Sequence, residues 1–166
     1  MIDDSLSAWK TSFAEHTDLR MQEMLRCRVR LQDGKIAQDE FSESTGISAR
    51  VYKNGLFGFS STAGRTDGDI KMGLDASLRN ALLLNSHVKP APRSLPLIES
   101  GRYDTGYPIR EIDRRYIYDL AREVDEYIGL HCHCLSSRQV WVTTDSIEKQ
   151  SVTSNGFDCH TLMLRS

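Results

Sequence analysis

Residues 46–62 read Gly-Ile-Ser-Ala-Arg-Val-Tyr-Lys-Asn-Gly-Leu-Phe-Gly-Phe-Ser-Ser-Thr, and the interpretation of the whole chain starts from this stretch. Asn54-Gly55 is a strong signal for a two-residue turn, because both residues tolerate the positive φ that a tight hairpin requires. The flanking residues alternate in polarity, as the two faces of a half-buried strand do. The stretch therefore predicts a hairpin whose strands cover residues 47–53 and 56–61.

A second hairpin is predicted upstream of the first. Apolar residues alternate with Arg26, Arg28 and Arg30 through residues 24–32, which indicates a strand with one buried and one exposed face. Asp33-Gly34 then gives another two-residue turn before a strand over about 35–42. Four strands joined by short connections predict an antiparallel meander.

Helical spacing appears in three other places. Apolar residues recur with that spacing in residues 5–16, 67–85 and about 110–128. Thr66 or Asp67 is the expected N-cap of the second helix. All four prolines fall within residues 87–109, which are expected to form a long loop that is functional or mobile.

The C-terminal part returns to strands. Strand-like segments cover residues 130–135, 139–144, 147–153 and 157–164, with turns expected at Asp145-Ser146 and Asn155-Gly156. Strands and helices come in blocks, which predicts an α+β fold: a largely antiparallel sheet with two to three packed helices. We expect residues 1–166 to form a single domain.

Composition excludes several classes of protein. The 166 residues carry a formal net charge of −2, so nothing in the overall charge favours nucleic acid or an anionic membrane as a partner. No apolar run approaches the roughly 20 residues that span a bilayer, and the first residues predict no secretion signal. The four cysteines are expected to be free thiols in a reducing cytoplasm.

Two side-chain groups are candidate sites. On a strand, His131 and His133 would share one face and Cys132 and Cys134 the other, so either pair could contribute to a zinc site completed by Cys159-His160. We favour a plain strand with outward histidines. The arginine row at 26, 28 and 30 could bind phosphate or carboxylate, but we favour ion pairs with acidic residues of the neighbouring strand, Asp39, Glu40 and Glu43. The chain has no GxGxxG, Walker, HExxH or Gly-x-Ser-x-Gly motif.

The stretch 46–62 resembles the glycine, arginine, turn and Gly-Phe-x-Ser-Thr pattern in the N-terminal domain of the TldD/PmbA (modulator of DNA gyrase) family of metallopeptidases. The order of elements around it, and the turn Ser154-Asn155-Gly156, are similar as well. Positions matching the family pattern are expected to be scaffold residues: Gly46, Arg50, Gly55, Gly58, Phe59, Ser61, Asn155 and Gly156. Of these, Gly58 suits close approach of another backbone, Phe59 is expected under the helix that starts near Asp67, and Arg50 is expected to hold a carboxylate.

The resemblance implies a cytoplasmic protein that forms dimers and takes part in the cleavage or maturation of unfolded peptides. The family's zinc site, an HExxxH helix plus a cysteine, lies in its C-terminal half and has no counterpart here. We therefore expect no catalytic residue, metal ligand or cofactor in this chain, with zinc in the absent catalytic half or in a partner subunit. The expected partners are a TldD/PmbA-like catalytic domain or subunit, and an extended peptide added to an exposed strand edge.

These features also leave a second function open. The chain would then be a free-standing interaction or metal-binding protein that uses the cluster at 131–134. The sequence equally leaves open whether the chain is a truncated form, one piece of a split enzyme or a degenerate copy.

Overall fold

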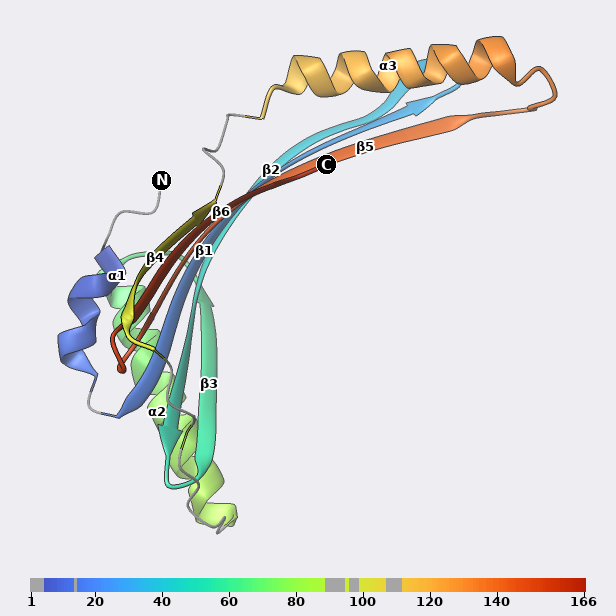
Figure 1. Ribbon diagram of the computed structural model, residues 1–166. Helices are drawn as coiled ribbons and strands as arrows, with labels where there is room; N and C mark the ends of the chain where they lie inside the picture. The colour runs from blue at the N-terminus through green and yellow to red at the C-terminus, as the bar shows by residue number, and fades with distance from the viewer. Residues whose placement is uncertain (1–4, 14, 89–94, 96–98, 107–111) are drawn as a thin grey trace. The chain divides into compact units, whose positions relative to one another are not determined.

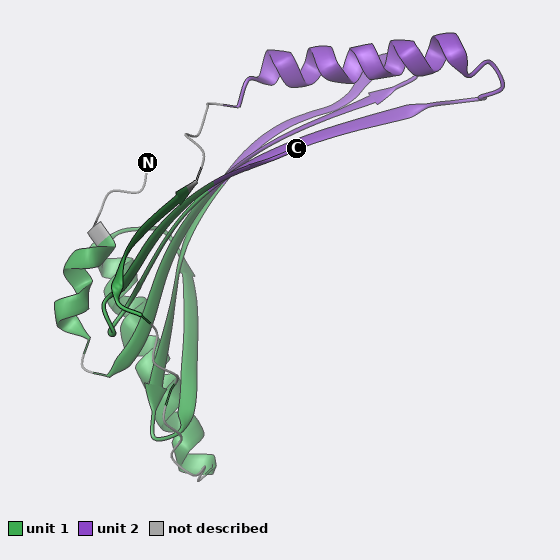
Figure 2. Ribbon diagram, in the orientation of Figure 1, with its two compact units in different colours: residues 1–23, 44–106, 148–162 green, residues 24–43, 107–147, 163–166 purple. Residues whose placement is uncertain are grey.

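The computed structural model describes residues 5–13, 15–88, 95, 99–106 and 112–166. They form two compact units, between which the chain passes several times (Figure 2). Unit 1 comprises residues 1–23, 44–106 and 148–162, and unit 2 comprises residues 24–43, 107–147 and 163–166. The single domain over residues 1–166 stays a prediction.

One six-stranded sheet runs through the structure in the order β3-β2-β1-β5-β6-β4 (Figure 1). Its strands are β1 (His16–Gln32), β2 (Lys35–Lys53), β3 (Leu56–Ala63), β4 (Gly101–Gly106), β5 (Gln139–Thr153) and β6 (Phe157–Arg165). The helices are α1 (Ser5–Ala8), the 3-10 helix η1 (Trp9–Ser12), α2 (Asp67–His87) and α3 (Arg114–His131). The α+β fold with a largely antiparallel sheet is confirmed. One pair of neighbours, β4 and β6, is parallel.

Both predicted hairpins are present. Asp33 and Gly34 have φ values of 49° and 78°, and Asn54 and Gly55 have φ values of 48° and 92°. Two successive residues with positive φ are the mark of the turn type that matches strand twist. The second turn sets Lys53 opposite Leu56 and fixes the register of β2 against β3.

Several strands are longer than predicted. β1 starts at His16 rather than at residue 24, and β2 is continuous across residues 43–46. β5 passes straight through Asp145-Ser146, where a turn was expected. The carboxylate of Asp145 accepts hydrogen bonds from the Arg26 guanidinium on β1 at 2.7 and 3.1 Å. The carboxylate of Asp145, which suggested a turn, therefore has its partner within the sheet.

Other predicted boundaries are wrong for different reasons. The first helical segment ends at Ser12, not residue 16, and Ala14 lies outside the described residues. β4 lies inside the predicted loop 87–109. The sequence did not predict this strand, because its partner β6 is more than fifty residues away and no local pattern indicates a strand there. Of that loop, residues 89–94, 96–98 and 107–109 lie outside the described part.

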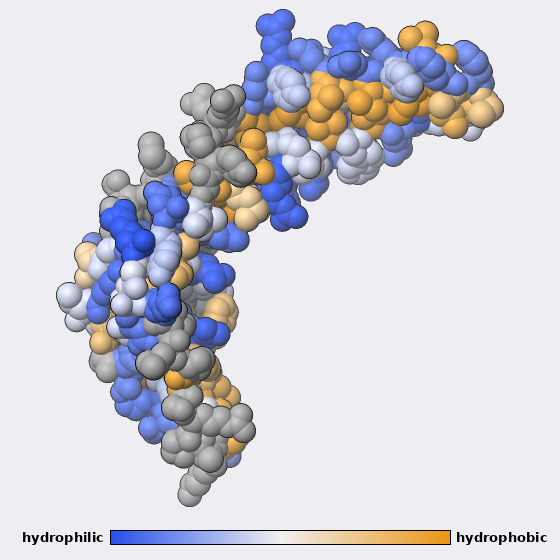
Figure 3. Space-filling model, in the orientation of Figure 1, coloured by the Kyte–Doolittle hydropathy of each residue, from blue (hydrophilic) through white to orange (hydrophobic). Residues whose placement is uncertain are grey.

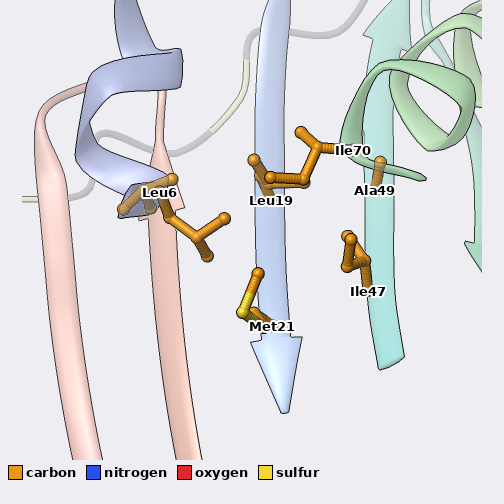
Figure 4. Close-up of a cluster of buried hydrophobic side chains, with 7 residues drawn as sticks. Leu6, Leu19, Met21, Ile47, Ala49 and Ile70 are labelled. Carbon is orange, nitrogen blue, oxygen red and sulfur yellow. The ribbon is translucent and has the colours of Figure 1, made fainter. Parts of the chain in front are cut away.

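Unit 1 is held together by a core between the sheet and the helices α1 and α2. Figure 4 shows how these side chains gather from separate elements. Its buried members are Leu6, Leu19, Met21, Ile47, Ala49, Ile70 and Val152. Thr66 starts α2 with a capping box, because its hydroxyl accepts from the Asp69 N–H while the Asp69 carboxylate accepts from the Thr66 N–H.

Unit 2 has its own core beneath α3. Hydrophobic atoms form a band along α3 in Figure 3, bordered by hydrophilic ones. The outward side of the helix carries the ion pairs Arg115–Asp119 and Arg122–Glu126, each one turn apart. The buried members of the core are Cys27, Val29, Leu31, Ile117, Ala121 and Val140.

Acid is expected to loosen the N-terminal helices α1 and η1 from the sheet of unit 1. Asp158, only 6% exposed, accepts hydrogen bonds from Ser7 and, at 3.0 Å, from Lys10. Burial pushes the pKa of the Asp158 carboxyl up, but the hydrogen bonds from Ser7 and Lys10 and the Lys10 charge bring it below its usual value. A lowered folded-state pKa stabilises the fold above the unfolded pKa, near 3.9, and this stabilisation is lost as the pH falls through the folded value.

Trp9 provides the measurement, because it belongs to η1 and packs against the core of unit 1. In a Trp141→Phe background, Trp9 fluorescence should shift to the red as the pH falls below about 4. The Asp158→Asn variant should already show part of that shift at neutral pH and respond less to acid. An unchanged acid transition in Asp158→Asn would assign the transition to other carboxylates.

Candidate functional site

The stretch 46–62 forms β3 and the second half of β2 in unit 1, and its side chains divide between two faces. Strand alternation places Val51 and its partner Gly58 toward α2, and Arg50 and its partner Phe59 on the opposite face. The residues of this stretch therefore lie on two faces of the hairpin. One face packs against α2, and the other is open.

At Gly58 the backbone of α2 packs tightly against the sheet. A Cβ at this position would lie 2.0 Å from the carbonyl oxygen of Ser77 and 2.3 Å from the nitrogen of Ala81. Both are helix backbone atoms, which cannot move aside as a flexible side chain can. The backbone of α2 thus approaches at the glycine where the sequence suggested a close approach.

Phe59 does not lie under α2. Its ring is 58% exposed on the opposite face, since adjacent residues of a strand cannot both point at the same helix. Arg50 does meet a carboxylate: its Nε donates to Asp18 Oδ2 at 2.8 Å. The Arg50 guanidinium also lies over the ring of Phe57, 4.6 Å from its centroid.

Two adjoining hollows occupy this open face, and we call them together the Arg20 groove. Arg20 and Ser48 line both hollows. The larger hollow, of about 490 Å³, is lined by Arg20, Gln22, Ser44, Thr45, Gly46, Ile47, Ser48, Ser61, Thr62 and Ala63. The smaller one, of about 230 Å³, is lined by Asp18, Arg20, Ser48, Ala49, Arg50 and Phe59.

The groove is rich in hydrogen-bond donors. Five residues with hydroxyl groups line the larger hollow, and the strand register places the side chains of Ser48 and Ser61 on its open face; the five are Ser44, Thr45, Ser48, Ser61 and Thr62. Arg20 is exposed and has no ion pair with any other residue of the described part. Sequence reasoning missed Arg20 and Asp18 because it began the strand at residue 24; extending the alternation of β1 back to residue 16 would have found them.

The cluster at 131–134 is not on a strand. His131 is the last residue of α3, where its Nδ1 lies 2.8 Å from the Tyr127 carbonyl oxygen and its ring stacks on that of Tyr127. Cys132 and Cys134 are exposed in the turn that follows. Across the described ranges, no three His, Cys, Asp or Glu side chains are arranged to hold a metal ion, and the residues present do not fit a zinc site.

The arginine row makes contacts across the strands of unit 2. Arg26 pairs with Asp145 on β5, and its hydrogen bonds lower the pKa of that carboxyl. Arg28 lies 3.6 Å from Glu40, and Arg30 lies over the ring of Trp141 at 5.1 Å. Asp39, one of the expected partners, instead accepts from Arg114 of α3.

The turn at Asn155-Gly156 joins β5 to β6. Gly156 has a φ of 87°, which explains glycine at this position. Its carbonyl oxygen accepts from the Gly101 N–H at 3.1 Å, and this bond anchors the start of β4. The role of these residues as family scaffold stays a prediction.

Comparisons with known proteins agree with this architecture. Residues 17–82 match the family described as PmbA/TldA metallopeptidase domain 1. These residues comprise most of β1, all of β2 and β3, and most of α2. Over this part, which is less than half of its length, the chain is similar to the first domain of the TldD/PmbA family.

Two solved structures share the fold. One is a Thermotoga maritima protein described as a modulator of a DNA gyrase, with a TM-score of 0.69, 16% identity, and coverage of 97% of this chain and 36% of that one. The other is TldE from Thermococcus kodakarensis, with a TM-score of 0.60, 14% identity, and coverage of 98% and 39%. The chain thus spans less than two fifths of either relative. No curated protein matches it significantly in sequence. In the described part, no helix is long and apolar enough to cross a membrane.

Proposed function

We propose that the chain is the non-catalytic N-terminal domain of a TldD/PmbA-like zinc metallopeptidase that acts on unfolded peptides. The position of the family match in the chain is the observation that supports this proposal. Residues 17–82 supply the packed hairpins of the sheet and α2, which are scaffold elements. The chain would provide a framework and subunit contacts, while zinc and the cleavage step belong to a catalytic domain or partner subunit.

An exposed leucine cluster supports a contact role. Leu82, Leu83 and Leu84, near the C-terminal end of α2, are 48%, 58% and 44% exposed. Neighbouring exposed apolar side chains of this size are typical of protein–protein contacts. We assign this cluster to the contact with a TldD/PmbA-like subunit, in a dimer within the cytoplasm.

A peptide could be bound at the strand edge or on the open face. β3 is an edge strand of the sheet, and an edge can accept an extended peptide as an added strand. The Phe59 carbonyl, however, already accepts a hydrogen bond from the Asn80 side chain at 2.8 Å. That bond covers part of the edge, so the open face of the same hairpin is the better candidate.

Reconstitution with a TldD/PmbA-like subunit that carries the HExxxH motif tests the proposal. The chain alone should contain no stoichiometric zinc and should not cleave a quenched fluorescent peptide derived from an unfolded protein. When mixed, the two chains should form a complex in light-scattering chromatography, and Leu83→Asp should abolish it. Lys71→Asp, near the other end of α2, is the matched control and should leave the complex intact.

Two results would contradict this function. One is failure of the wild-type chain to bind such a subunit. The other is stoichiometric zinc in the isolated chain that is lost in Cys132→Ser, which would instead support a free-standing metal-binding protein.

A further inference from the structure

We infer that the Arg20 groove binds extended peptide segments that carry a carboxylate side chain, with Arg20 as the residue that selects for the negative charge. This inference rests on the proposed function and deepens it, because it names the class of peptide that the domain would receive. Nothing in the family match or in the similar structures assigns a ligand to this face.

The charges of the groove favour an acidic ligand. Its titratable side chains are Arg20, Arg50 and Asp18. Asp18 accepts from Arg50, so these two neutralise each other. His16 also contacts this carboxylate, with its Nε2 3.5 Å from Asp18 Oδ1. Arg20 is left as the uncompensated charge of the groove.

The chemistry of Arg20 suits a carboxylate. A guanidinium presents its N–H groups as a planar fork that matches the two oxygens of a carboxylate, and such charge-assisted pairs are stronger than neutral hydrogen bonds. The surrounding hydroxyls and the Gln22 amide add donors that can bind the remaining lone pairs of a carboxylate or of peptide carbonyls.

The length of the groove suits an extended segment. From the Gly46–Ala63 pair to the Arg50–Phe59 pair is four residues along β2, or about 13 Å. A strand of about four residues has that length. The exposed Phe59 lines the smaller hollow, at the Arg50–Phe59 end of this span, so an apolar side chain is expected next to the acidic one.

Fluorescence anisotropy with two short labelled peptides tests the inference on the full chain. One peptide alternates serine with glutamate and ends in leucine, and the other has glutamine at each glutamate position. We expect the glutamate peptide to bind about ten-fold more tightly. Arg20→Ala should remove this difference, and Arg20→Lys, which keeps the charge but lacks the fork, should retain only part of it.

Arg79→Ala is the matched control, since it removes an exposed arginine from α2 and should leave the preference for glutamate unchanged. Equal binding of the two peptides, binding of neither, or an equal loss in Arg20→Ala and Arg79→Ala would each overturn the inference. Arg20→Ala should still form the complex with the catalytic subunit. The two experiments therefore distinguish failure of the peptide-binding inference from failure of the proposed function.

Discussion

Replacing Gly58 with alanine is expected to lower the free energy of unfolding by about 3 kcal/mol or more. The added methyl group would lie 2.0 Å from the Ser77 carbonyl oxygen and 2.3 Å from the Ala81 nitrogen. Relief requires that α2 move as a body away from β3. The movement would open the core that Ile70 forms with the sheet, so loss of packing adds to the steric cost.

Urea unfolding followed by circular dichroism measures this effect, and Gly73→Ala is its control. Gly73 is also buried on α2, but a Cβ there meets only the Ser60 Oγ at an ordinary 3.8 Å. Because alanine favours a helix over glycine, Gly73→Ala should be neutral or stabilise the protein by up to about 1 kcal/mol. Equal stability of the Gly58→Ala and wild-type chains would show that α2 packs farther from β3 than the structure indicates.

Replacing Arg138 with methionine is expected to lower the melting temperature of the protein by roughly 10 °C or more. Asp125 on α3 is only 2% exposed, and the Arg138 guanidinium donates to its two oxygens at 2.9 and 2.8 Å. Methionine keeps much of the side-chain volume but leaves a buried carboxylate without its partner. The effect is large because the carboxylate stays buried and charged with no partner. The lost attraction between the two charges contributes less.

A second substitution separates the two causes. In Asp125→Leu/Arg138→Met both charges are gone, and we expect recovery of most of the lost stability. Hydrogen exchange should report faster exchange in α3 of the single variant and unchanged exchange in α2 of unit 1. If the double variant were as unstable as Arg138→Met, the unpaired carboxylate would not be the cause.

Short-range sequence signals were sufficient to predict the two hairpin turns and the start of α2. Asp33-Gly34 and Asn54-Gly55 adopt positive φ because the residues themselves tolerate it, without help from distant parts of the fold. Thr66 and Asp69 cap α2 through bonds within four residues of each other. The α+β class and the family resemblance follow from the same short-range patterns.

Phe59 was predicted under the helix that starts near Asp67, and Gly58 beside a backbone that the sequence did not identify. That backbone belongs to α2, and because neighbours on a strand point to opposite faces, α2 cannot also cover Phe59. Strict use of the alternation would have put Phe59 on the open face, where it now borders the Arg20 groove.

Pairing between residues far apart in the sequence accounts for the features that the sequence did not predict. β4 exists because β6 lies beside it, and β5 passes through Asp145 because Arg26 on β1 binds that carboxylate. Likewise Asp125 can be buried only because Arg138 comes back to it from beyond the turn after α3. The Arg20 groove combines side chains of β1, β2 and β3, so no single segment reveals it. Short-range preferences fix turns and caps, whereas strand length, buried charges and binding surfaces depend on partners that only the folded sheet brings together.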